Sequence, residues 1–163
     1  PRGSYLDALS PLTVTLGVQN VSFVAQAVDW IPESLFQILT AAYRHRGLSF
    51  VRILQRCPEF VGNMFEPWVH DPQRMLMLTH ADGIRVSPAL QKIYRNQLPH
   101  DPADINRARE IASSEDPIPV GILYRNPEVP CYEDLRGAGK LRTADQVRSA
   151  LDGELDKFTV WPQ

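Results

Sequence analysis

The stretch VSFVAQAVDWIPESLFQILTAAYRHRGLSFVRILQ, residues 21–55, decides the predicted fold. It begins with a short apolar run, Val21–Ala27, whose β-branched and aromatic residues are typical of a strand buried on both faces. Over Ser34–Arg46 the apolar residues follow helical spacing, and Gly47 is a typical helix stop. Ser49–Gln55 predicts a second buried strand. The order strand, helix, strand predicts parallel pairing with a right-handed crossover.

Further elements are expected on both sides of this unit. Ser10 is a good N-cap and is followed by proline, so a short helix is predicted over Ser10–Val18. The middle, Pro58–Pro102, is interrupted by prolines and shows no sustained period, which predicts a long irregular cover or contact loop. After this segment the sequence predicts three elements: a helix over Pro102–Ser113 capped by Asp101, a strand over Ile118–Arg125, and a helix over Thr143–Leu151. The expected fold class is α/β, with a mostly parallel sheet flanked by helices.

Composition excludes some classes of function. The 163 residues are 44% hydrophobic, which is enough for a core without a metal or disulfide staple. The 17 basic and 19 acidic residues are mixed along the chain, with a net charge of -2, so no nucleic-acid partner is expected. No apolar run approaches the roughly 18 residues of a membrane span, and no secretory signal is recognisable. The expected location is therefore cytoplasmic, with no membrane partner.

The two cysteines and the first residue of the sequence lead to two further predictions. Cys57 and Cys131 are the only cysteines, and in a reducing compartment a disulfide between them is not expected. The sequence begins at Pro1 rather than methionine and enters a helical pattern almost at once. We therefore expect the chain to be a segment of a longer polypeptide.

Several short strings resemble one family in order and spacing. They are LG at residues 16–17, FVA at 23–25, HRGLSF at 45–50, CPEF at 57–60 and IPVGILY at 118–124. The β subunits of the 2-oxoacid:ferredoxin oxidoreductases carry similar strings, among them TFVAR, HKGFSF, PCVTFN and PIGIFY. The resemblance spans about Ser10 to Leu135, which is most of the chain.

The resemblance implies a fold, cofactors and partners. It implies a partial thiamine diphosphate-binding fold with an irregular C-terminal extension, divided into the core (1–57), the C-terminal region of the β subunit (58–135) and a polar tail (136–163). The implied cofactors are thiamine diphosphate, Mg²⁺ and a 4Fe-4S cluster. The implied partners are an α subunit, ferredoxin, a 2-oxoacid such as 2-oxoglutarate or pyruvate, and coenzyme A. The implied reaction is oxidative decarboxylation of the 2-oxoacid to acyl-CoA and CO₂.

Cys57 is the one candidate site residue, both as a cofactor contact and as a metal ligand. By position it resembles the last of the four cysteines that hold the family's cluster, and thiolates are the usual ligands of such clusters. The competing interpretation is a small buried hydrophobic residue at a strand end. In the same loop Glu59 and Val61 replace the family's threonine and asparagine, and Asn63 follows. Glu59 would lower a nearby cluster's reduction potential, or it is a solvated carboxylate.

Other residues depart from the family or favour structural roles. The family's other three cluster cysteines and its GDG motif have no counterpart here, so the chain cannot build the cluster unaided, and no catalytic residue is assigned. Cys131 is interpreted as incidental. Met75 and Met77 are interpreted as core residues, or as the lining of a pocket or interface. The histidines are scattered without metal-ligand spacing and are interpreted as structural: His45, His70, His80 and His100.

Three hypotheses remain open from the sequence. The first is a segment of a 2-oxoacid:ferredoxin oxidoreductase β subunit that is inactive alone. The second is a non-catalytic α/β interaction or scaffold domain derived from such a subunit, with 58–102 as its contact loop. The third is a thiamine-dependent decarboxylase that uses no iron. Cys57 discriminates among them, because only the first hypothesis needs its thiolate.

Overall fold

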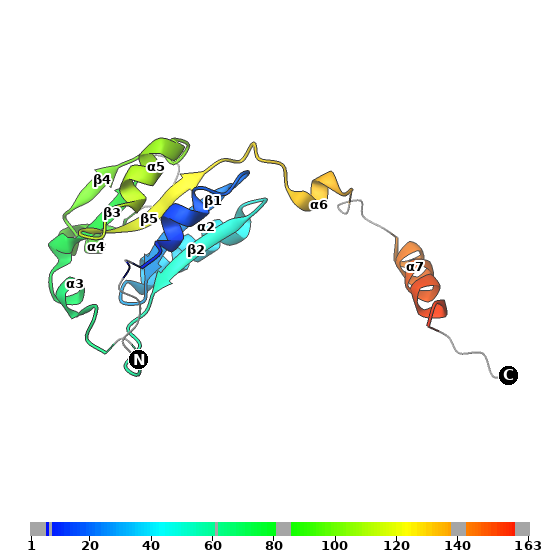
Figure 1. Ribbon diagram of the computed structural model, residues 1–163, viewed down its shortest axis with the longest axis horizontal. Coiled ribbons are helices and arrows are strands. Elements are labelled where there is room, and N and C mark those ends of the chain that lie inside the picture. Colours follow the sequence, from blue (N-terminus) through cyan, green and yellow to red (C-terminus); the bar gives the residue numbers. More distant parts are fainter. Residues whose placement is uncertain (1–5, 7, 61, 81–85, 138–142, 159–163) are drawn as a thin grey trace. The chain divides into compact units, whose positions relative to one another are not determined.

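The computed structural model describes residues 6, 8–60, 62–80, 86–137 and 143–158 (Figure 1). The chain divides into two compact units, Pro1–Pro130 and Cys131–Gln163, which are described separately. Within the described residues no helix is both long enough and apolar enough to cross a membrane.

The first unit alternates helices and strands. In chain order its elements are α1 (Pro11–Thr15), β1 (Phe23–Val28), α2 (Pro32–Arg44), β2 (Ser49–Leu54), α3 (Glu66–His70), η1 (Pro72–Arg74), β3 (Met75–Thr79), α4 (Pro88–Ile93), β4 (Gln97–Pro99), α5 (Ile105–Ala112) and β5 (Ile118–Arg125). The second unit contains α6 (Tyr132–Leu135) and α7 (Ala144–Asp156).

The five strands form one sheet in the order β2-β1-β5-β3-β4. β1 pairs with β2 in parallel, with Val28 opposite Leu54. β3 is parallel to both β4 and β5, whereas β1 and β5 are antiparallel. The predicted α/β class with a mostly parallel sheet is therefore confirmed. It agrees with the partial thiamine diphosphate-binding fold that the resemblance implies.

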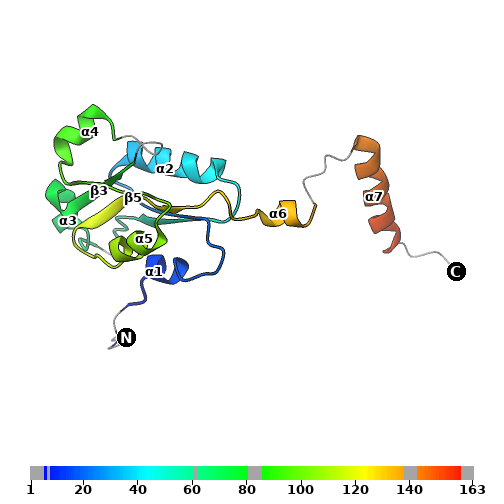
Figure 2. The same ribbon diagram turned by 90° about the horizontal axis from the view of Figure 1, so that it is seen from above.

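Helices cover both faces of the sheet. Figure 2 shows α2 and α4 over one face and α1 and α5 over the other. Each face has its own apolar cluster: Phe23, Ala25 and Ala27 of β1 belong to the first, and Val24 belongs to the second. All six residues of β1 are buried, as predicted for a strand covered on both faces.

Local signals explain where several elements begin and end. The Ser10 side chain accepts a hydrogen bond from the Thr13 amide, which confirms Ser10 as the N-cap of α1. Gly47 follows α2 with a φ of +125°, and a Cβ there would lie 2.8 Å from Ser22 Oγ, so only glycine fits. In the second unit, Thr143 and Gln146 form a capping box at the start of α7.

Four expectations need correction. β2 is only partly buried, because among the described strands it lies at the edge of the sheet and pairs only with β1. The segment 58–102 is not one irregular loop: it contains β3, whose apolar residues show no period because both faces of the strand are packed. α5 is capped by Asp104, since Asp101 instead accepts from the Ala103 amide in the preceding turn. α7 continues past Leu151 to Asp156.

The contact between β5 and β3 provides a test of the packing. Gly121 has a φ of +138°, and a Cβ there would lie 2.8 Å from Leu78 Cβ. We predict that Gly121→Ala lowers the free energy of unfolding by about 2–4 kcal/mol, from backbone strain and overpacking. Urea denaturation measures this. Gly153→Ala, in open space on α7, is the control and should not destabilise; equal stability of Gly121→Ala and wild type would contradict the packing.

Candidate functional site

The carboxyl ends of β1 and β2 lie at the same edge of the sheet, because the two strands are parallel. Asp29 and Trp30 follow β1, while Arg56 and Cys57 follow β2. Ligands of open α/β sheets bind at such edges. The structure therefore places the predicted site residue, Cys57, where a ligand-binding loop is expected.

An ion pair holds the start of this loop. The Arg56 side chain donates from Nε to Asp29 Oδ1 at 2.9 Å, and its backbone amide donates to Asp29 Oδ2 at 3.1 Å. The Asp29 amide in turn donates to the Leu54 carbonyl at 3.0 Å. The Arg56 guanidinium also lies 5.8 Å from the ring centroid of Trp30. The residue directly before Cys57 is thus anchored to the end of the neighbouring strand.

Cys57 itself lies in a tight turn. Its amide donates to the Gln55 carbonyl at 3.0 Å, and its carbonyl accepts from the Gly62 amide at 3.1 Å. The residue is half-buried, and its thiol forms no disulfide bond. Glu59 and Phe60 are exposed at the tip, and Val61 lies outside the described residues.

A row of aromatic rings extends along the same edge of the sheet. The ring centroids of Trp30 and Phe65 are 5.6 Å apart, and those of Phe65 and Trp68 are 6.2 Å apart. Trp68 Nε1 donates to Asp116 Oδ1 at 3.3 Å, and the Arg74 guanidinium lies 4.7 Å from a Trp68 ring centroid. The segment that precedes β3 is joined in this way to the turn that precedes β5.

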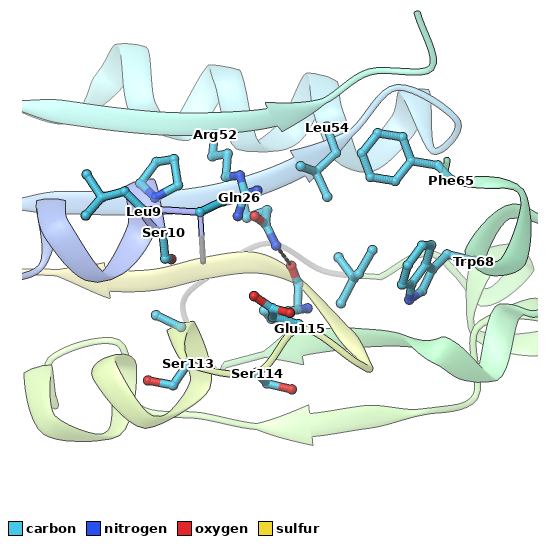
Figure 3. Close-up of a pocket in the computed structure, with 15 residues that line it drawn as sticks. Leu9, Ser10, Gln26, Arg52, Leu54, Phe65, Trp68, Ser113, Ser114 and Glu115 are labelled. Carbon is cyan, nitrogen blue, oxygen red and sulfur yellow. Dashed lines mark hydrogen bonds between the residues drawn. The ribbon is translucent and has the colours of Figure 1, made fainter. Parts of the chain in front are cut away.

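A pocket of about 240 Å³ opens beside this row (Figure 3). Gln26 and Arg52 approach it from neighbouring positions of β1 and β2, and Glu115 approaches it from the turn before β5. Phe65 and Trp68 form an aromatic wall. Cys57 does not line the pocket, so the two features are separate.

The described residues do not hold the full ligand set of a 4Fe-4S cluster. No group of three or more His, Cys, Asp or Glu side chains among them could hold a metal ion. A 4Fe-4S cluster needs four thiolates, and the only other cysteine, Cys131, is the N-cap of α6 in the second unit. The donor set therefore fits one ligand of a shared cluster, and Cys57 has the chemistry and the partial exposure for that role.

Comparison with known proteins identifies one group of similar proteins. Residues 89–139 match the family model that describes the C-terminal part of the pyruvate ferredoxin oxidoreductase beta subunit. A 2-oxoacid:ferredoxin oxidoreductase subunit beta from Sulfolobus sp. is 27% identical over 139 residues, which cover 82% of this chain and 41% of that protein. The chain is similar in sequence to β subunits of 2-oxoacid:ferredoxin oxidoreductases.

Two further relatives differ in how much of the chain they match. Subunit beta of 2-oxoacid:ferredoxin oxidoreductase 2 from Aeropyrum pernix is 27% identical over 78% of this chain and 38% of that protein. The 2-oxoglutarate oxidoreductase subunit KorB of Mycobacterium tuberculosis is 33% identical over 52% of this chain and 23% of that protein. The chain thus spans about two fifths, or less, of the length of these relatives.

The sequence singled out Cys57 as a candidate but did not indicate the residues that anchor its loop or lie beside it. Asp29 comes just after the first predicted strand and Arg56 just after the second. Because these strands were predicted to be parallel, the opposite charges of the two residues could have indicated an ion pair at one edge of the sheet. The aromatic row and the pocket had no such signal. Phe65 and Trp68 lie far along the chain from Asp116, and only the fold brings these segments together.

The Arg74–Asp116 pair predicts a pH dependence of stability. Arg74 donates from Nη2 to Asp116 Oδ2 at 2.5 Å, and this hydrogen bond holds the pKa of Asp116 below its usual value. A depressed carboxyl pKa stabilises the fold above the ordinary Asp pKa, and the stabilisation is lost as pH falls through the lowered pKa. Asp116→Asn should therefore be less stable than wild type at neutral pH. Thermal unfolding at a series of acid pH values measures this: the difference in stability between wild type and Asp116→Asn should disappear as the pH falls. A difference in stability that does not change with pH would contradict the role of the ion pair.

Proposed function

We propose that this chain is the C-terminal part of a β subunit in a 2-oxoacid:ferredoxin oxidoreductase. The proposed reaction converts a 2-oxoacid and coenzyme A to acyl-CoA and CO₂, and reduces ferredoxin. The observation that carries the proposal is the half-buried free thiol of Cys57, in an anchored turn at the carboxyl edge of β2. The match to named β subunits supports the same assignment.

Cys57 is proposed to supply one thiolate to a 4Fe-4S cluster. The turn that holds its backbone, and the ion pair of Arg56 with Asp29, would fix where its sulfur points. The other three thiolates would come from outside this chain's described site, as the resemblance implies. Exposed Glu59 would add negative charge close to the loop and favour the oxidised cluster.

Thiamine diphosphate would supply the electron sink for decarboxylation when bound. No residue of this chain is assigned to its diphosphate or to Mg²⁺, and the chain alone is proposed to be inactive.

An α subunit and ferredoxin are the proposed protein partners. The relatives' names include both 2-oxoglutarate and 2-oxoacid, and the matching family model names pyruvate, so the proposal extends only to the class of 2-oxoacids. A cytoplasmic location fits the two free thiols.

Substitution of the two cysteines tests the proposal. In the assembled oxidoreductase, we expect Cys57→Ser to lose most cluster iron, the electron paramagnetic resonance signal of the reduced cluster, and 2-oxoacid-dependent reduction of ferredoxin. Cys131→Ser is the matched control and should behave as wild type, because the resemblance places a cluster ligand at Cys57 and none at Cys131. Thermal unfolding checks that both variants fold.

Two results would contradict the assignment. Full iron content and full ferredoxin reduction in Cys57→Ser would remove Cys57 from the cluster and favour the scaffold hypothesis. Loss of iron in Cys131→Ser, with Cys57→Ser unaffected, would transfer the ligand role to the second unit.

A further inference from the structure

One residue that lines the pocket beside the aromatic row, Gln26, has a buried acceptor without a donor in the described part of the chain. Gln26 is 2% exposed, and its Oε1 has no hydrogen-bond partner among the described residues. Its Nε2 donates to the Pro119 carbonyl at 2.8 Å, which fixes the orientation of the amide. A buried acceptor left unpaired is costly, so an N–H group of a ligand in the pocket would satisfy it.

Two residues of opposite charge, Arg52 and Glu115, also line the pocket. Arg52 is opposite Gln26 in the parallel register of β1 and β2, is half-buried, and makes no hydrogen bond or ion pair with another described residue. Burial lowers the pKa of Arg52, and the Glu115 carboxylate acts in the opposite direction, but a guanidinium stays charged at neutral pH. Glu115 lies on the exposed rim. The pocket thus offers one cation and one anion.

The rest of the pocket includes an apolar and aromatic wall. Leu54, Phe65 and Trp68 line it together, and Figure 3 shows the rings of Phe65 and Trp68 on the same side of the pocket. The volume of about 240 Å³ exceeds the roughly 150 Å³ of an engineered cavity that binds benzene. A side chain of the size of phenylalanine's therefore has room beside the charged groups.

We propose that this pocket binds a free amino acid with an apolar or aromatic side chain. The ligand's carboxylate pairs with Arg52, whose planar guanidinium suits a carboxylate. Its ammonium donates to Gln26 Oε1 and is attracted by Glu115, and its side chain packs on Phe65 and Trp68. A zwitterion matches the balanced charges, whereas a phosphate or dicarboxylate would place excess negative charge beside Glu115. This inference is independent of the proposed oxidoreductase function.

Calorimetric titration of the full chain with three matched probes tests the ligand class. The probes are phenylalanine, phenylpropionate, which lacks the ammonium, and phenethylamine, which lacks the carboxylate. We expect phenylalanine to bind and each analogue to bind roughly tenfold or more weakly, because each loses a charge-assisted contact. Absence of phenylalanine binding, or equal affinity for all three probes, would overturn the proposal.

Variants of the two charged groups assign the binding to this pocket. Arg52→Met should reduce phenylalanine affinity to that of phenethylamine, and Glu115→Gln should weaken the preference for phenylalanine over phenylpropionate. Arg148→Gln and Glu128→Gln are the controls, because both side chains are exposed and outside the pocket. Both pocket residues are partly or fully exposed, so the variants should fold, which thermal unfolding checks. Unchanged binding in both pocket variants would place the ligand elsewhere and overturn the assignment.

Discussion

Burial of β1 on both faces is the constraint on which the rest of the first unit depends. All six of its residues are buried, and the strand pairs with β2 on one side and β5 on the other. Full burial of a residue such as Val24 or Phe23 stabilises the fold by about 1.5–3 kcal/mol. Because both faces of β1 need cover, α2 has to pack on one side and α1 with α5 on the other.

The pairing of β1 with its neighbours also sets the position of the candidate site. Parallel pairing carries Asp29 and Arg56 to the same edge, where their ion pair anchors the turn that presents Cys57. The antiparallel pairing of β5 brings the turn before that strand, with Glu115 and Asp116, to this edge as well. The thiol loop, the aromatic row and the pocket are therefore neighbours through strand direction rather than through sequence distance.

Much of this could be predicted, and what was missed has physical reasons. The unit from β1 to β2 was recognisable because α2 has helical apolar spacing and ends before Gly47. β5 was predicted over its observed residues, since IPVGILYR is a continuous apolar run with clear ends. β3 was missed because a short run packed on both faces has no period, and Asp104 displaced Asp101 as a cap because Asp101 is used in a turn.

The sequence by itself determined the α/β class, the strand–helix–strand unit and Cys57 as the residue of interest, because these follow from local spacing and from motif strings along the chain. Only the tertiary structure decided that β2 is an edge strand and that β5 runs against β1. It alone gathered Gln26, Arg52 and Glu115 around one pocket. The edge position of β2 and the direction of β5 depend on pairing between segments far apart in the sequence, and no local pattern encodes that pairing.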